Sequence, residues 1–141
     1  MRFRLAWRRR GKKAGESGQS LVELSLILPV FLLLLAGLVE VGDSLNSYLT
    51  VIDASRDAAR LGSRGQATDT DIRNLVGKDM ERLRDPFTPA AGVTVNRTPM
   101  PGDTTVKVTV CYDHALIFPV PGFLPDPIHM CSSTTMRAIT Y

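Results

Sequence analysis

The chain has 141 residues, of which 17 are basic and 14 acidic, giving a formal net charge of +3. The charge is unevenly distributed. Residues 1–18 hold seven basic residues and one acidic residue, a net +6, whereas the rest holds ten basic and thirteen acidic residues, a net −3. This length allows one small core and no second independent domain. Because the positive charge is confined to a short leader, it does not indicate a nucleic-acid-binding domain, and we expect no nucleic-acid partner.

The leader at residues 1–18 is expected to be unstructured because its like charges repel one another. An excess of Lys and Arg before an apolar segment holds that end of a membrane protein in the cytoplasm. The chain from about residue 40 onward is therefore expected on the far side of the membrane. The basic residues of the leader are Arg2, Arg4, Arg8, Arg9, Arg10, Lys12 and Lys13.

An apolar segment follows the leader. Leu24 to Val39 is a run of sixteen uncharged residues, and an extension back to Gln19 makes it long enough to cross a hydrocarbon core of ~30 Å. The sequence therefore predicts a transmembrane segment at about residues 19–39. Pro29 lies inside it and is expected to kink or loosen the helix, because its missing N–H leaves a backbone carbonyl without its partner.

Glu23 is a carboxylate just inside this apolar run. Such a group costs roughly 2.5–3.5 kcal/mol at mid-membrane and needs a partner, so it is a functional candidate. With Gly18 it resembles a class III, or prepilin-type, signal, in which a peptidase cuts after a glycine and leaves a glutamate fifth in the mature chain. A cut after Gly18 makes Gln19 the new N-terminus. Gly11 and Glu16 have the same spacing, but two lysines and no apolar run follow Gly11.

Two other interpretations of the N-terminus remain open. An ordinary secretory signal has the same basic and apolar regions, but the apolar run here is long for that purpose and no Ala-x-Ala site follows. An uncut signal anchor is the second alternative.

The helix is predicted to continue to residue 62, so that it covers residues 19–62. An amphipathic pattern follows the span, and Gly62 to Gly65 form the stop. The apolar positions of that pattern are Val41, Leu45, Tyr48, Leu49, Ile52 and Ala59.

Residues 66–141 are predicted to form a small α+β domain with one helix and an antiparallel sheet of about three strands. Thr68 is the expected N-cap of the helix, which ends before Asp85. Alternating apolar residues predict strands at 93–95, 105–111 and 132–141. Residues 114–130 contain four prolines and are expected to form a loop. Its apolar part, 115–124, either packs over the sheet or binds a partner.

Cys111 and Cys131 are expected to form a disulfide, because both lie in the exported part of the chain. It closes a loop of about twenty residues, which is worth roughly 3 kcal/mol in the chain-entropy model. The alternatives are two free thiols, or a zinc site in which His114 and His129 join the two thiols. The spacings are not those of a zinc finger, so no metal is expected. No catalytic set or cofactor motif occurs in the sequence, which indicates a protein that is not an enzyme.

The sequence from Gly18 to Glu23, the leucine-rich run with Pro29, and the segments 38–42 and 54–60 together resemble the TadE/TadG-like family. These proteins are minor pseudopilins of the tight-adherence, or Flp-type, pilus and secretion machinery. The resemblance covers about residues 17–62, and its glutamate corresponds to Glu23. It implies cleavage after Gly18 by a prepilin peptidase. It also implies a single-pass inner-membrane protein with a periplasmic domain, which joins or primes a pilus with other pilins and the assembly platform.

Glu23 is expected to serve assembly. In an apolar bundle of like helices, its carboxylate and the free amine of Gln19 on a neighbour neutralise each other, and the gain is greatest where water is absent. The alternative function is an uncleaved single-pass anchor whose periplasmic domain binds a ligand or an envelope partner.

Overall fold

The computed structural model describes residues 16–119 and 126–138 and forms two compact units, residues 1–37 and 38–141. Residues 1–15 of the predicted leader therefore lie outside the described part. One helix, α1 (Glu16–Ser63), contains residues of both units. It ends where Gly65 adopts a φ of +76°, a left-handed conformation that suits glycine and stops helices. The predicted stop between Gly62 and Gly65 is where the helix ends.

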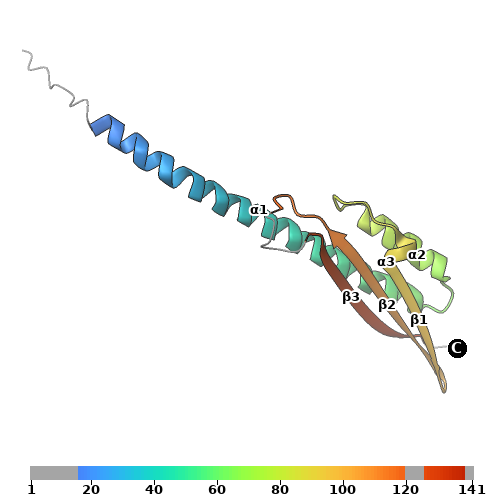
Figure 1. Cartoon of the computed structure of the whole chain (residues 1–141). Coiled ribbons are helices and arrows are strands. Elements are labelled where there is room, and N and C mark those ends of the chain that lie inside the picture. Colours follow the sequence, from blue (N-terminus) through green and yellow to red (C-terminus); the bar gives the residue numbers. More distant parts are fainter. Residues whose placement is uncertain (1–15, 120–125, 139–141) are drawn as a thin grey trace, which may run out of the picture. The chain divides into compact units, whose positions relative to one another are not determined.

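The second unit is an α+β domain, which confirms the predicted fold class (Figure 1). Two further helices precede a three-stranded sheet. The sheet is antiparallel throughout and has the order β1-β2-β3. The elements are α2 (Asp69–Met80), α3 (Pro89–Gly92), β1 (Val93–Met100), β2 (Asp103–His114) and β3 (Ile128–Ala138).

Helix α2 begins with the capping interaction that its sequence predicts. The Asp71 backbone N–H donates to the Thr68 hydroxyl at 3.2 Å, and the Thr68 N–H donates to the Asp71 carboxylate at 2.9 Å. Hydrogen bonds from the Thr68 hydroxyl and backbone lower the pKa of Asp71. The helix ends at Met80, before the predicted end, although Leu83 still packs against the core.

β1 continues past its predicted end, β2 extends at both ends, and β3 begins before its predicted start. Residues 139–141 of the last predicted strand lie outside the described part. β1 runs through Pro99, which an edge strand tolerates because it needs no hydrogen bond on its outer side. β2 continues to His114 and β3 already begins at Ile128, so the predicted loop at 114–130 is wrong at both ends. The prolines inside it masked the alternation of the flanking residues. Of the shorter connection at 115–127, residues 120–125 lie outside the described part.

The face of α1 that packs on the sheet is not the face predicted from the large apolar residues. Leu45 is 54% exposed, and the other predicted positions up to Leu49 are exposed as well. The helix instead buries small side chains against the valines of β2. A methyl group on Gly62 would lie 2.8 Å from Val106 Cγ1, which shows how closely helix and strand approach. The buried residues of α1 are Glu40, Ser47, Val51, Ala54, Ser55, Ala58, Ala59 and Gly62, and of these Ala59 is a predicted apolar position.

One hydroxyl at this interface links the helix to β3. Ser55 is fully buried, and its hydroxyl donates to the Ile52 carbonyl at 2.8 Å. The hydroxyls of Ser132 and Thr134 each lie 3.0 Å from it. One donor and two lone pairs are thereby used, so burial leaves this side chain without an unmet hydrogen bond.

Substitutions on the two faces of α1 should have different effects on stability. Val51→Ala, on the buried face, should lower the free energy of unfolding by about 2 kcal/mol, because buried methyl groups are lost and a cavity remains. Leu45→Ala, on the exposed face, should change it by less than about 0.5 kcal/mol. The free energy of unfolding of both variants is measured on the full chain in detergent micelles, by urea unfolding monitored through hydrogen exchange of the β2 amides. Equal losses would contradict the assignment of the faces.

Candidate functional site

The residues of the predicted processing signal lie in the first turns of α1. A methyl group on Gly18 would meet no atom of another part of the chain within 4 Å. No contact within the described chain therefore demands a glycine there, although glycine costs up to ~1 kcal/mol inside a helix. Glu23 is exposed, and its Oε1 accepts a hydrogen bond from the side-chain amide of Gln19 at 3.4 Å. The carboxylate has this local partner one turn away.

The apolar segment of α1 has no partner within the described chain. Every large apolar side chain from Leu21 to Val39 is exposed. This helix is long and apolar enough to cross a membrane. An exposed apolar surface of this extent indicates contact with lipid or with other apolar helices. Pro29 lies within it, and α1 remains helical on both sides of the proline.

In the second unit, α1 presents a further row of exposed apolar residues. Its spacings of three and four residues form a stripe along one side of the helix, as in a coiled-coil seam. The members of this exposed stripe are Leu38, Val41, Leu45, Tyr48 and Leu49. Beside them lies an apolar groove of about 370 Å³, whose far wall is formed by Leu116, Ile128 and Met130.

Part of α1 matches a known protein family. Residues 18–60 match the family model described as TadE-like protein, so the matched segment begins at Gly18 and ends within the buried face of α1. This segment of α1, which is less than half of the chain, is similar to TadE-like proteins. A search of curated proteins and a search of solved structures gave no match.

The TadE-like family is a structural, non-enzymatic family of the tight-adherence pilus system. The match therefore supports a place for this chain in that system. The matched segment contains Glu23, Pro29 and the whole exposed stripe. It does not contain α2, the sheet or the cysteines, so these features have to be interpreted from their own geometry.

Glu40 attaches the TadE-like helix to the connection between β2 and β3. Its side chain accepts hydrogen bonds from the Ile117 backbone N–H at 3.1 and 3.0 Å and from the Phe118 N–H at 3.0 Å. Only 9% of Glu40 is exposed. Sequence reasoning missed this role. The signal was its spacing, since Glu40, Ser47, Val51 and Ala54 fall on one side of an α-helix.

A second group of charges surrounds His114, which is fully buried at the end of β2. Its Nδ1 lies 3.4 Å from the Ser47 hydroxyl, and its Nε2 lies 3.6 Å from Asp43 Oδ2. Asp85 Oδ2 is 3.7 Å from Nδ1. Arg84 joins the two carboxylates, at 3.3 Å from Asp43 and 3.4 Å from Asp85. This His114 group ties α1, β2 and the segment after α2 together.

The pKa of Asp85, a member of the His114 group, and the pKa of the neighbouring Tyr112 differ from their ordinary values. Burial raises the pKa of Asp85, but hydrogen bonds from the Ala115 N–H and from Arg84 outweigh it, so that the pKa is lowered overall. Burial is also the largest cause of the raised pKa of Tyr112, whose hydroxyl donates to the Asp85 carboxylate at 3.3 Å. Asp85 therefore stays ionised at neutral pH and serves as an acceptor for its neighbours.

The two cysteines lie on the opposite face of the sheet from His114. Cys111 and Cys131 are direct partners in the β2–β3 register and form a disulfide, with Cα atoms 4.1 Å apart. Successive side chains of a strand alternate between faces, so His114 lies on the opposite face from the two cysteines. The four residues of the alternative zinc site therefore do not come together. His129 lies beside the disulfide instead, and the two sulfur atoms are bonded to each other, so neither is available as a thiolate ligand.

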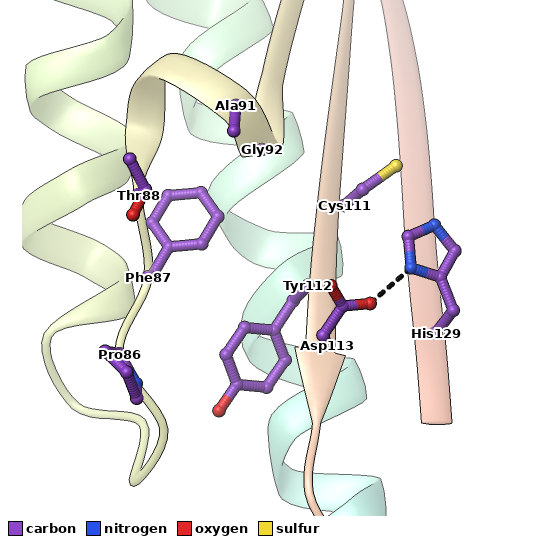
Figure 2. A pocket seen from close by; sticks show the side chains of 9 residues that line it. All are labelled: Pro86, Phe87, Thr88, Ala91, Gly92, Cys111, Tyr112, Asp113 and His129. Carbon is purple, nitrogen blue, oxygen red and sulfur yellow. Dashed lines mark hydrogen bonds and ion pairs between the residues drawn. The ribbon is translucent and has the colours of Figure 1, made fainter. Parts of the chain in front are cut away.

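A hollow of about 240 Å³ adjoins the disulfide (Figure 2). The segment that joins α2 to β1 forms one wall, with the ring of Phe87 facing Cys111. Asp113 and His129 line the other side and contact each other. The alternation of the strand directs Asp113 and His114 to opposite faces, and Asp113 pairs with His129.

The Glu40 contacts predict a local effect. Glu40→Gln leaves a single oxygen acceptor in place of a carboxylate that serves two amides. An unmet buried donor costs about 1–3 kcal/mol. We expect the Ile117 and Phe118 amides to exchange their hydrogens about tenfold faster or more. Hydrogen-exchange mass spectrometry of the full chain in detergent measures this. Glu81→Gln, at an exposed position, is the matched control and should change nothing.

Proposed function

We propose that this chain is a minor pseudopilin-like structural subunit of a tight-adherence, or Flp-type, pilus machine. In this proposal a prepilin peptidase removes residues 1–18, and the mature chain stays in the inner membrane with its α+β domain on the periplasmic side. From there it takes part in pilus assembly or surface adhesion. The observation that carries the proposal is the TadE-like match, which begins at Gly18 and covers an apolar helix without partners in the described chain.

The surroundings of Gly18 support processing at this position. The residue is a glycine inside a helix, yet no contact with another described part of the chain requires one. A glycine lowers the stability of the helix, but it lets another molecule approach the backbone closely, as a peptidase does at its cleavage site.

The position of Glu23 supports a role in assembly. Within the described residues its side chain is hydrogen-bonded to the neutral amide of Gln19, a partner that brings no positive charge. Cleavage after Gly18 creates a positive amine at Gln19 of each subunit. In a bundle of like helices, that amine and the Glu23 carboxylate of a neighbour neutralise each other where water is excluded.

The exposed stripe from Leu38 to Leu49 supports packing by a second pilin-type helix outside the membrane. Its spacing suits a helix–helix seam, and the groove beside it offers space for further apolar side chains. The occupant that we propose is the corresponding helix of another pilin or pseudopilin, because its apolar face has the same length and period.

The first test concerns cleavage. Gly18→Val should leave the leader attached, because the added side chain blocks close approach to the backbone. The mature N-terminus and the mass of the membrane-extracted protein, measured by mass spectrometry, report the result. Gly11→Val is the matched control, since Gly11 has the same spacing to a glutamate, and its product should still begin at Gln19. A wild-type chain that keeps residues 1–18 would favour the uncleaved, anchored interaction domain instead.

The second test concerns Glu23. Glu23→Leu should insert and be cut normally, because neither step uses the carboxylate, but should join other pilins poorly. Removal of one partner from a buried ion pair costs roughly 3–5 kcal/mol, which corresponds to at least a hundredfold weaker association. Crosslinking to pilin partners in the membrane, with Val22→Leu as control, measures the loss. Crosslinking equal to that of wild type would remove Glu23 from the assembly mechanism.

A further inference from the structure

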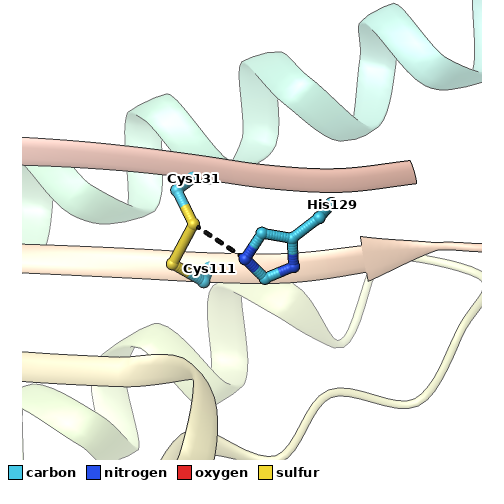
Figure 3. A group of neighbouring side chains, drawn as sticks. All are labelled: Cys111, His129 and Cys131. Atoms are coloured by element: carbon cyan, nitrogen blue, oxygen red, sulfur yellow. Dashed lines mark hydrogen bonds between the residues drawn. A yellow bond between two sulfur atoms is a disulfide. The ribbon is translucent and has the colours of Figure 1, made fainter. Parts of the chain in front are cut away.

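The exposed face of the sheet carries a sulfur–imidazole–carboxylate group outside the TadE-like segment. Figure 3 shows its two cysteines and His129, and Figure 2 shows the contact between His129 and Asp113. Cys131 Sγ lies 3.2 Å from His129 Nε2. On the other side of the ring, His129 Nδ1 contacts Asp113 Oδ1. The side chains of His129 and Asp113 are each 64% exposed, so reagents in solution reach this group.

The contacts of the imidazole fix which nitrogen faces the sulfur. A carboxylate accepts hydrogen bonds, so Asp113 holds the proton of His129 on Nδ1. Nε2 then faces Cys131, and in the imidazolium form it donates a proton to this sulfur. A nearby imidazolium stabilises a thiolate, and a stabilised thiolate leaves a disulfide faster.

The two sulfurs of the disulfide are therefore not equivalent. Cys131 has the imidazole, whereas Cys111 borders the hollow whose opposite wall is Phe87. Figure 2 shows Phe87 on one side of Cys111 and His129 on the other. Cys111 lines this hollow and Cys131 is not among its lining residues, so a thiolate that enters the hollow reaches Cys111, while Cys131, beside the imidazole, is the sulfur placed to leave.

We propose that Cys111–Cys131 is an exchange-active disulfide whose co-reactant is a dithiol of the Cys-x-x-Cys class. One thiolate of the dithiol attacks Cys111 Sγ and forms a mixed disulfide. The electrons of the old S–S bond pass to Cys131 Sγ, which takes the proton of His129 Nε2. The second thiol of the co-reactant, as its thiolate, then attacks the mixed disulfide and releases Cys111 as a thiolate. The protein disulfide is reduced by two electrons and the dithiol becomes a disulfide; the reverse sequence installs the bond.

The fold permits exchange without unfolding. Register pairs between β2 and β3 extend on both sides of the cysteines, from Thr104 with Ala138 to His114 with Ile128. These backbone pairs keep the strands together when the sulfur bond opens. Asp113 and His129 also come from the two strands, so the pairing itself keeps the imidazole beside Cys131.

The test uses the full chain in detergent micelles with dithiothreitol as the dithiol. The rate of disulfide reduction at neutral pH should fall on the order of tenfold in His129→Ala, because Cys131 then leaves without a proton donor. Added imidazole should restore part of the rate. Ser133→Ala, on the same exposed face and two residues beyond Cys131, should reduce at the wild-type rate. Asp113→Asn should be slowed and Asp113→Glu should recover, as expected for a residue that positions the ring.

The site of attack is a second, independent readout. After brief exposure to glutathione and an acid quench, alkylation and peptide mass spectrometry should find glutathione on Cys111 and the alkyl label on Cys131. Circular dichroism of the oxidised variants checks that they remain folded. Equal reduction rates in wild type and His129→Ala, or glutathione attached first to Cys131, would overturn the proposal and leave the disulfide as a structural crosslink only.

Discussion

The close contact between α1 and β2 is the constraint on which the second unit depends. The valines at 106, 108 and 110 present a bulky apolar face, and the helix meets it with alanine, serine and glycine. Small side chains let the backbones approach, and close packing of the interior then leaves no place for leucines on that side. The leucines of the same helix are consequently on the outside, where they form the exposed stripe. The packing of small α1 residues against β2 thus determines the core and also leaves the exposed stripe on the surface.

Two glutamates of α1, Glu23 and Glu40, have different surroundings. Glu23 lies in the apolar segment, where the neutral amide of Gln19 is hydrogen-bonded to it. Glu40 is buried, and backbone N–H groups satisfy its oxygens. The first carboxylate is available for a charge that another molecule brings, whereas the second already has its partners within the unit. Both lie in the TadE-like segment, which therefore contains the carboxylate that we propose for assembly and a carboxylate that stabilises the fold.

Local patterns predicted much of this fold, because they depend on neighbouring residues. The cap at Thr68, the helix end near Gly65 and the alternation of β2 are of this kind. The packed face of α1 was mispredicted, since large apolar residues ordinarily mark a core and here mark the surface. The His114 group and the pairing of Asp113 with His129 join segments far apart in the sequence. Strand register brings such residues together, and no spacing in the sequence reports it.

Because Glu40 binds backbone groups of the connection after β2, the side chains at that point can vary between related chains. The carboxylate binds the peptide N–H groups at positions 117 and 118, while the side chains of Ile117 and Phe118 are exposed. Recognition of the backbone is indifferent to the side chain, so every residue type except proline retains the donor. Residues 117 and 118 are therefore held in place through their backbone, while their side chains can vary. Related chains can change what this part of the surface presents without loss of the attachment that holds it in place.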